Sequence, residues 1–273
     1  MSESAEKVAV LSHDPVWLRI CEEAEAIARR EPTLAGLVHE TVLDQESLEL
    51  GLAERVASRL SYTSFPAAHI RNAFRDALAE DPGLADIFRV DMVAVFDRDP
   101  ACERLIEPLL YFKGYHAIAA QRVAHSLWNR GRRDLALMLQ SRASTVFQVD
   151  IHPAVPMGKG IFIDHATGVV IGATAQIGDD VSILQGVTLG GTGKDGGDRH
   201  PKIGHGVLLG AGAKVLGNFD IGYCSRVAAG SVVLSAVPPL VTVAGVPAKV
   251  VGSAGCREPS RSMDQILADL GPS

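Results

Sequence analysis

The sequence predicts an α+β protein whose helices and strands are segregated along the chain. We expect an all-helical N-terminal domain at residues 1–147, then a left-handed parallel β-helix of hexapeptide repeats at 148–253 with one extruded loop at 190–202, and a flexible C-terminal tail at 254–273. Three observations predict this. The first 150 residues hold 5 of the 27 Gly and the whole net charge of −6, apolar residues there recur at helical spacing, and in the second half they recur every six residues.

The N-terminal half has the patterns of amphipathic helices. One run of aliphatic residues recurs every four positions: Leu48, Leu52, Val56 and Leu60. The stretch 115–127 follows the i, i+3, i+4, i+7 rule and is followed by Gly131, placed as a C-terminal stop. Three Asp-Pro steps, at Asp14, Asp81 and Asp99, predict an N-cap Asp with Pro in the first turn of a helix. We expect about six to eight helices in this half.

The C-terminal half has a period of six. Its aliphatic residues form three runs: Ile151, Met157 and Ile163; Ile171, Ile177, Ile183 and Leu189; and Ile203, Leu209, Val215, Ile221, Val227 and Val233. Neither a helix nor a flat strand has this period. A three-sided coil does, because each six-residue side turns one aliphatic residue inward and small residues make the corners. Residues 151–250 supply about five coils, and a β-sandwich would show this spacing only by chance.

Two breaks in the phase predict irregular features on the coil. One falls at residues 164–170. The other is GGTGKDGGDRHPK at 190–202, which is too rich in Gly and charge to lie inside a coil. We expect a loop extruded from the scaffold, a position that commonly carries function.

The composition disfavours several classes of protein. No apolar run approaches the roughly 18 residues of a membrane span, and the N-terminus lacks the apolar core of a secretory signal. The net charge of −6 argues against nucleic acid or an anionic membrane as the main partner. The four Cys form no CxxC pair, which argues against a disulfide scaffold and predicts a cytoplasmic protein.

Candidate chemistry gathers at the two breaks. His165 follows Asp164 at the first break, and Asp150 stands 15 residues earlier, about one coil away. A carboxylate on one imidazole nitrogen would make the other a general base, but Asp150 as a cap and His165 as a corner residue explain the spacing equally well. Arg199 and His200 in the loop could hold a carboxylate, although spacing alone favours solvated loop side chains.

A zinc site is a rival interpretation of the histidines. His165, His200 and His205 are three candidate ligands, and β-helix carbonic anhydrases bind zinc through three His on this kind of scaffold. We expect no metal, because His200 belongs to the extruded loop and His205 faces outward two residues after the inward Ile203.

Longer motifs are found in four segments: DPACERLIEPLLYFKGYHAIAAQRVAHSLWNRGRRDLA, DIHPAVPMGKGIFIDHATGVVIG, VSILQGVTLGGTGKDGGDRHPKIG and AGVPAKVVG. They strongly resemble bacterial serine O-acetyltransferase, a hexapeptide-repeat acyltransferase, from about residue 45 to 253. The resemblance implies transfer of acetyl from acetyl-CoA to the hydroxyl of L-serine, the first step of cysteine biosynthesis from serine. It also implies feedback inhibition by L-cysteine at the serine site and no permanently bound cofactor.

Carried over residue by residue, the resemblance implies catalytic and substrate-binding roles. His165 would be the general base of a direct attack on the thioester, with Asp150 as its dyad partner. Asp99 would reach the substrate ammonium and Arg199 the carboxylate. The site shared by serine and cysteine would comprise Asp99, Asp164, His165, Arg199 and His200. For acetyl-CoA the resemblance implies an oxyanion contact at a backbone N–H near Gly191, a pantetheine path and more distant contacts, at these residues: Gly191, Thr192, Ala211, Ala229 and Lys249.

The resemblance also implies partners. The family forms trimers with active sites between neighbouring coils, and the helical domains join two trimers into a hexamer. Its C-terminal tail docks in O-acetylserine sulfhydrylase through a terminal Ile, but this chain ends in ADLGPS, which puts that partner in doubt. Two other functions stay open. The chain could acetylate another hydroxyl, such as that of homoserine or a sugar, because a pocket discriminates weakly against one extra methylene. It could also be a catalytically inactive scaffold that only binds a sulfhydrylase.

Overall fold

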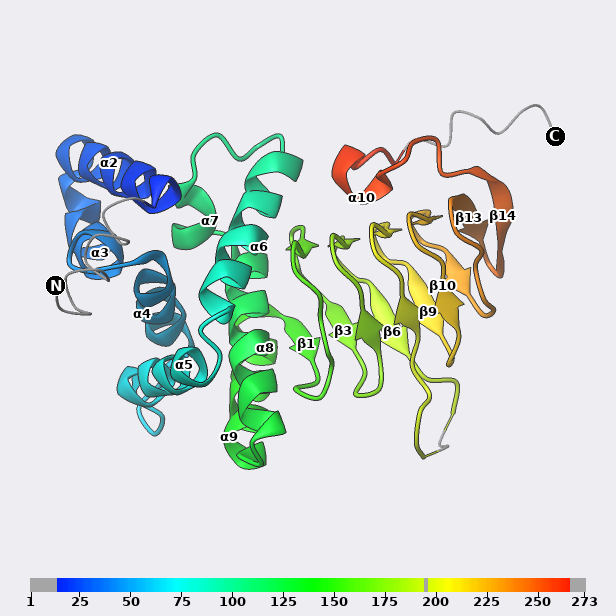
Figure 1. Ribbon diagram of the computed structural model, residues 1–273, viewed down its shortest axis with the longest axis horizontal. Coiled ribbons are helices and arrows are strands. Elements are labelled where there is room, and N and C mark those ends of the chain that lie inside the picture. Colours follow the sequence, from blue (N-terminus) through cyan, green and yellow to red (C-terminus); the bar gives the residue numbers. More distant parts are fainter. Residues whose placement is uncertain (1–13, 194–195, 266–273) are drawn as a thin grey trace, which may run out of the picture.

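The computed structural model describes residues 14–193 and 196–265, and in it a helical half is followed by a half of parallel strands (Figure 1). Eight α-helical segments lie in the described part of the helical half, which agrees with the expected number. The elements of this half are α2 (Pro15–Arg30), the 3₁₀ turn η1 (Pro32–Leu34), α3 (Ala35–Val38), the π-helical turn η2 (His39–Leu43), α4 (Leu48–Leu60), α5 (Ala67–Glu80), α6 (Leu84–Arg98), α7 (Ile106–Leu110), α8 (Lys113–Asn129) and α9 (Arg133–Phe147).

The ends of the described helices test the prediction that Asp is the N-cap at each of the three Asp-Pro steps. Asp14 is the N-cap of α2, and its carboxylate accepts two first-turn N–H groups. Asp81 and Asp99 instead follow α5 and α6 as C-caps, so the N-cap prediction is wrong for both. Each of these two carboxylates accepts the N–H two residues further on, which is an Asx turn. Gly131, with a φ of +76°, follows α8 as predicted.

The strand half is a three-sided parallel coil, here called the prism, whose successive strands rotate through three sheets. Sheet 1 contains β1 (Val149–Ile151), β3 (Val169–Ile171), β6 (Thr188–Gly190), β9 (Lys214–Leu216) and β12 (Val232–Val233). Sheet 2 contains β4 (Gln176–Ile177), β7 (Lys202–Ile203) and β10 (Asp220–Ile221). Sheet 3 contains β2 (Phe162–Ile163), β5 (Ser182–Ile183), β8 (Leu208–Leu209), β11 (Arg226–Val227), β13 (Val241–Gly245) and the antiparallel β14 (Ala248–Ser253).

The strand registers confirm the 18-residue repeat and show where it is interrupted. Val170 lies beside Thr188, and Lys214 lies beside Val232, each pair 18 positions apart. Thr188 lies beside Lys214, 26 positions on, so this coil carries eight extra residues. They form the loop that leaves the prism between β6 and β7, as predicted (Figure 1). The apolar positions of the run from 203 to 233 are all buried, at 4% exposure or less.

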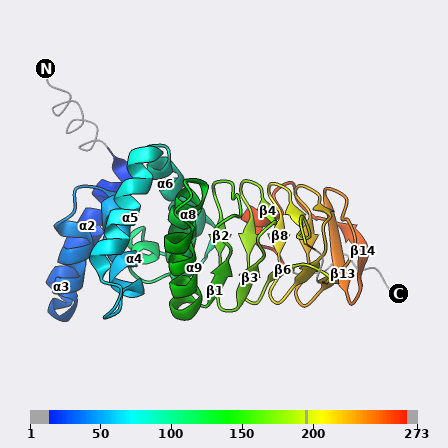
Figure 2. The same ribbon diagram turned by 90° about the horizontal axis from the view of Figure 1, so that it is seen from below.

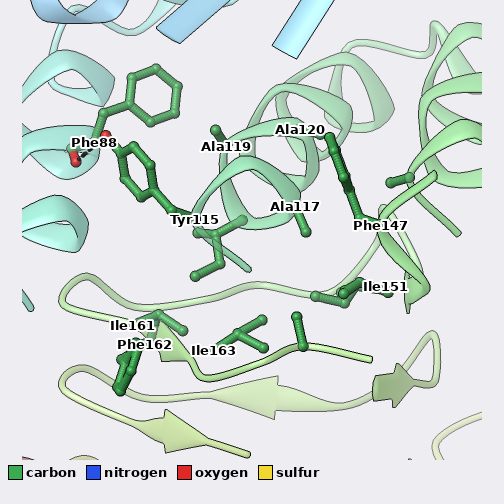
Figure 3. Close-up of a cluster of buried hydrophobic side chains, with 14 of the residues drawn as sticks. Phe88, Tyr115, Ala117, Ala119, Ala120, Phe147, Ile151, Ile161, Phe162 and Ile163 are labelled. Carbon is green, nitrogen blue, oxygen red and sulfur yellow. Dashed lines mark hydrogen bonds between the residues drawn. The ribbon is translucent and has the colours of Figure 1, made fainter. Parts of the chain in front are cut away.

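One buried apolar cluster joins the helical half to the first coil (Figure 3). Tyr115 and the alanines of α8 lie over Ile151, Ile161 and Ile163, and the Tyr115 hydroxyl donates a hydrogen bond to the Phe88 carbonyl (2.9 Å). Figure 2 shows α8 and α9 standing against the end of the prism that begins with β1. The junction is therefore a packed interface and not a loose linker.

A buried ion pair fastens the same junction. Arg122 of α8 donates from Nε to Asp91 Oδ2 of α6 at 2.6 Å, and both side chains are buried. Arg122 Nη2 also donates to the Gly158 carbonyl (2.6 Å), and the Ile161 N–H donates to Asp91 Oδ1 (2.9 Å). Every partner of this pair is thus in the helices or the first coil, so the pair holds the two halves together.

The described part of the segment after β14, residues 254–265, corrects the expectation of a flexible tail there. Residues 254–265 turn back along sheet 3, and their short helix α10 (Pro259–Ser262) contacts α6 and β8 (Figure 1). Pro259 and Ser260 are buried. The final residues, on which the expected sulfhydrylase contact falls, lie outside the described residues. No helix in the described ranges is long and apolar enough to cross a membrane.

Candidate active site

Three of the predicted site residues surround one cavity between the helical half and the prism. Asp99 comes from the end of α6, and Asp164 and His165 come from the turn after β2. The cavity has a volume of about 430 Å³, and the connection between α7 and α8 and the start of α8 complete its wall. Residues far apart in the sequence thus meet at this one place.

Asp99 is held by the end of its own helix. Its N–H donates to the Val95 carbonyl (3.0 Å), and its Oδ1 accepts the N–H of Ala101 (2.9 Å). Within the described part of the chain, its Oδ2 has no hydrogen-bond partner. One oxygen of the carboxylate therefore shapes the turn, and the other can receive a ligand.

His165 stands on a tight turn with a rare backbone conformation. The φ angles of His165 and Ala166 are +53° and +63°, in the left-handed region that non-glycine residues seldom occupy. The Thr167 N–H donates to the His165 carbonyl at 2.7 Å, which closes the turn. The His165 side chain is 74% exposed, and its Nε2 lies 3.8 Å from Asp164 Oδ2. Such conformations cluster at functional sites, where the surrounding structure holds them.

A lysine from the helical half contacts this turn. Lys113, the first residue of α8, donates from Nζ to Thr167 Oγ1 and lines the same cavity. Burial and, secondarily, the charge of Arg59 lower the pKa of Lys113. Sequence reasoning missed Lys113, because its position at the start of a helix is indistinguishable from that of a solvated lysine.

The cavity is electrostatically suited to a cation. Burial raises the pKa of Asp164; the neighbouring His165 opposes the rise, and the negative charge of Asp99 adds to it. Two carboxylates facing one cavity repel each other, so a cation between them stabilises both ionised forms. The arrangement fits a small ammonium group.

Arg199 and His200 lie elsewhere, at the base of the extruded loop. The Thr174 hydroxyl oxygen accepts the N–H of Arg199 (3.0 Å) and of His200 (3.2 Å), and it lies 2.7 Å from His200 Nδ1. The His200 ring covers Gly172, where a Cβ would come within 2.0 Å of Nε2. Burial, and then the charges of Arg199 and Lys202, lower the pKa of His200, which favours its neutral form. Sequence reasoning missed Thr174, because it is 25 positions from Arg199 in the sequence and only the stacking of coils brings the two together.

Asp150 lies on β1, and its carboxylate is hydrogen-bonded to a side chain of α9. Its Oδ1 accepts a hydrogen bond from Gln140 Nε2 of α9 at 2.7 Å. The Gln148 carbonyl, two residues earlier, accepts the Gly168 N–H (2.9 Å), so β1 runs beside the end of the His165 turn. Among the described residues, however, no hydrogen bond or ion pair within 4.0 Å joins Asp150 to His165. The dyad stays a prediction.

The corner of the prism that precedes the strands of sheet 1 is here called the first edge. Along it, one hydrogen bond of 2.8 Å per coil links successive corners: Gly186 N–H to Thr167 O, Gly212 N–H to Gln185 O, and Gly230 N–H to Ala211 O. Two of the residues expected to contact acetyl-CoA, Ala211 and Ala229, therefore lie in line with the His165 turn.

The corner that follows the strands of sheet 1 is called the second edge. Thr192, at the start of the loop, lies near Gly217, and Gly191 lies near the Arg199 side chain. Lys249, on β14, pairs with Ala244 at the far end of the prism. Strands of three residues, about 10 Å long, separate the two edges. The structure thus brings Asp99, Asp164 and His165 together but does not bring Arg199 and His200 to them.

The histidines of the zinc interpretation occupy three different places. His165 is on the first edge and His200 is on the second. His205 stacks on Tyr223, with ring centroids 5.1 Å apart and planes 7° apart. No group of three His, Cys, Asp or Glu residues suited to a metal ion gathers within residues 14–193 and 196–265.

Comparison with known proteins identifies close relatives. A family model described as "Serine acetyltransferase, N-terminal" matches residues 16–120. The serine acetyltransferase of Salmonella typhimurium is 53% identical over 250 residues, 92% of each chain. The crystal structure of serine acetyltransferase from Brucella abortus in complex with coenzyme A is 53% identical, has a TM-score of 0.88, and covers 90% of this chain and 98% of its own. A serine acetyltransferase solved in complex with cysteine is 48% identical with a TM-score of 0.90, and covers 92% and 98%.

Proposed function

The chain belongs to the serine acetyltransferase family, and from this premise we propose that it transfers the acetyl group of acetyl-CoA to the hydroxyl of L-serine, giving O-acetyl-L-serine and CoA. This is the first step of cysteine biosynthesis from serine. The observation that carries the proposal is the cavity at the junction, where Asp99, Asp164 and His165 converge. A cavity of about 430 Å³ lined by two carboxylates and one imidazole suits a small amino acid, because the carboxylates can hold its ammonium and the imidazole can take the proton of its hydroxyl.

We assign the two charged ends of serine to different groups. The ammonium would lie between the carboxylates of Asp99 and Asp164, whose mutual repulsion it relieves. The carboxylate would be held by the Arg199 guanidinium, with the His200 ring beside it. Gripping both ends orients the hydroxyl toward the imidazole of His165.

The chemistry needs a base because a serine hydroxyl is a weak nucleophile at neutral pH. His165 would take the hydroxyl proton as the oxygen attacks the thioester carbon, and would return it to the departing CoA thiolate. Asp150 would orient and stabilise the imidazolium, after exchanging its bond to Gln140 for one to the ring. A backbone N–H near Gly191 would stabilise the oxyanion. The transfer is direct, with no acetyl-enzyme.

The donor would lie along the first edge. Small side chains at Ala211 and Ala229 would allow the thin pantetheine chain to approach the backbone, and Lys249 would contact the donor further along. Thr192, on the second edge, would reach it from a neighbouring chain. The coenzyme A complex of the Brucella abortus relative supports acetyl-CoA as the donor. The cysteine complex of another relative supports feedback inhibition, and we propose that L-cysteine occupies the serine site.

The division of the site between two edges supports an oligomer. If the second edge of one prism faces the first edge of its neighbour, Arg199 and His200 reach the cavity that holds His165. We propose that three chains close such a ring and that the helical domains, residues 1–147, join two rings into a hexamer. Each prism, residues 148–253, would be a left-handed coil, as the hexapeptide spacing and the family imply.

The proposed activity is tested by following the loss of acetyl-CoA thioester absorbance with L-serine, L-homoserine or no acceptor, each with and without L-cysteine. Serine-dependent turnover that cysteine blocks is expected, and turnover with homoserine alone would move the substrate. His165→Ala is expected to lower kcat at least about 10²-fold, the low end for a positioned base. Near-normal kcat would remove His165 from that role.

The shared site is tested by mixing inactive chains. His165→Ala and Arg199→Ala chains, co-expressed with different tags and purified as mixed oligomers, should regain activity, because one interface in them joins two intact edges. No regain would place the whole site within one chain. Mixing His165→Ala with Asp150→Asn identifies the chain whose Asp150 serves each base, since activity returns only if the dyad spans two chains.

A further inference from the structure

The segment of residues 254–265, here called the C-terminal strap, is bonded across the outer face of sheet 3 (Figure 1). The Ser182 hydroxyl donates to the Ser260 carbonyl at 2.7 Å, and Arg226 Nη1 donates to the Asp264 carbonyl at 2.9 Å. Ser182 and Ser260 are 0% and 1% exposed. The strap therefore leads from the far end of the prism back to the helical half.

The side chain of Arg98, the last residue of α6, contacts the same Ser182 hydroxyl as the strap. Its side chain is 3% exposed, donates from Nη2 to Asp180 Oδ1 (2.7 Å), and donates from Nη1 to Ser182 Oγ (3.1 Å). The strap touches both partners of Arg98, because Ser260 accepts from Ser182 and Arg261 Nη2 lies 3.6 Å from Asp180 Oδ1. A buried guanidinium with two partners is costly to displace, so this anchor is rigid.

The anchor faces away from the active site but is covalently next to it. Val95 and Asp99 of the α6 end line the cavity that holds His165. Ala94 and Arg98 line a second cavity, of about 330 Å³, on another side of the helix end. Arg98 therefore does not line the cavity that holds His165, but it is covalently bonded to Asp99, which does.

The same anchor is also connected to the second carboxylate. Ser182 is followed by Ile183, whose carbonyl accepts the N–H of Asp164 at 2.9 Å. A continuous path of covalent and hydrogen bonds thus runs from Asp99 through Arg98, Ser182 and Ile183 to Asp164. Asp99 is covalently next to Arg98, and Asp164 is hydrogen-bonded to the residue after Ser182. Both carboxylates therefore lie close, along this path, to the contact between Arg98 and Ser182.

We propose that Arg98 is a positioning residue that sets the distance between the Asp99 and Asp164 carboxylates, and that the C-terminal strap completes its anchor through Ser260. The inference rests on the proposed function, in which these carboxylates hold the ammonium of serine. Loosening the anchor then weakens serine binding and leaves the acetyl-CoA contacts on the prism unchanged.

The chain offers a closely matched control for this proposal. Arg226 is also buried and also donates to a buried hydroxyl, that of Thr242 (3.1 Å). It bonds the strap directly, at the Asp264 carbonyl, whereas Arg98 reaches the strap through Ser182 and Asp180. The Thr242 hydroxyl in turn donates to the Ser253 carbonyl (2.8 Å), just as Ser182 does to Ser260. Arg226 lies further along sheet 3, on β11, and the bonds of this network connect it to Asp99 only indirectly, through the strap, Ser182 and Arg98.

The experiment compares full-length Arg98→Lys and Arg226→Lys, measuring kcat, KM for L-serine, KM for acetyl-CoA and Tm. Arg98→Lys should raise the serine KM by about tenfold or more, equivalent to about 1.4 kcal/mol of lost serine binding, with acetyl-CoA KM within about twofold. Arg226→Lys should leave both KM values unchanged. Equal serine KM values in the two variants, or equal rises in both KM values for Arg98→Lys, would overturn the proposal.

Two further variants separate the possible failures. Asp99→Asn should raise the serine KM; if it does and Arg98→Lys does not, the positioning role alone is refuted. If Asp99→Asn leaves the serine KM unchanged, the proposed ammonium site fails and the positioning role fails with it. If Arg98→Lys does not fold, the same comparison is made by removing the hydroxyl partner of each arginine, with Ser182→Ala and Thr242→Val. The serine KM should then rise in Ser182→Ala and stay unchanged in Thr242→Val.

Discussion

Replacing Gly114 by Ala is expected to lower the activity by displacing the turn that carries Asp164 and His165. Gly114 is the second residue of α8, and a Cβ there would lie 2.0 Å from the carbonyl oxygen of Ile163, the residue before Asp164 and His165. Ordinary contact begins at 3.4 Å, which leaves a shortfall of about 1.4 Å. Because the atom in the way belongs to the backbone, no side-chain rotation relieves the clash.

The magnitude follows from that distance. The start of α8 and the end of β2 must separate by more than 1 Å, and a 1 Å misplacement of catalytic groups can cost about 10²-fold in rate. We therefore expect kcat of Gly114→Ala to fall by about 10²-fold or more. Overpacking of this kind also costs roughly 1–3 kcal/mol of stability, so Tm should fall as well.

The assay is acetyl-CoA consumption with saturating L-serine, together with thermal unfolding. Gly36→Ala is the matched control, because a Cβ at Gly36 meets nothing within 4 Å. It should leave kcat unchanged and raise helix stability by roughly 0.5–1 kcal/mol. A Gly114→Ala protein with the kcat and Tm of the original chain would refute the reasoning, since it would mean that α8 does not press on the turn.

Two further predictions concern buried titratable groups in the helical half. Asp91→Asn should lower the free energy of unfolding by about 3–5 kcal/mol in denaturant titrations, because it leaves Arg122 buried beside a neutral group. Asp91→Leu combined with Arg122→Met should recover part of that loss, and no recovery would mean that the bonds of Arg122 to carbonyls dominate. Burial lowers the pKa of His116 from 6.5 to about 3, so unfolding takes up a proton between these values and stability falls with falling pH by about 1.4 kcal/mol per unit there. His116→Gln should flatten this slope, and an unchanged slope would contradict the assignment.

The repeat was predictable because its physical cause is local. Each side of the prism needs one inward aliphatic residue and a small residue at the corner, so the spacing of six reports the coil directly. The extruded loop was predictable for the same reason, as an interruption of that spacing. The Asp-Pro steps were a poorer guide, because an Asp that accepts an N–H two residues on is equally suited to begin a helix or to follow one, and Asp81 and Asp99 follow theirs.

The candidate site was predictable in its members but not in its arrangement. Motifs pointed to Asp99, Asp164, His165, Arg199 and His200, and the first three do share a cavity. Spacing by about one coil suggested that Asp150 and His165 stack, yet Asp150 is bonded to Gln140 from a helix whose position no repeat encodes. The path of the loop base, closed by Thr174, also depends on contacts across 25 or more positions.

The three-sided coil, its interruption and the identity of the chemical groups follow from the order of residues alone, because a period of six and a run of turn residues act through neighbours along the chain. Which of those groups share a cavity, and the bonding of the segment after β14 to the prism, emerge only when the chain is folded. Contacts such as Arg98 to Ser182, 84 positions apart, and Ser182 to Ser260, 78 positions apart, leave no periodic trace. They arise when helix, coil and strap pack together, and burial then makes an unpaired polar group costly.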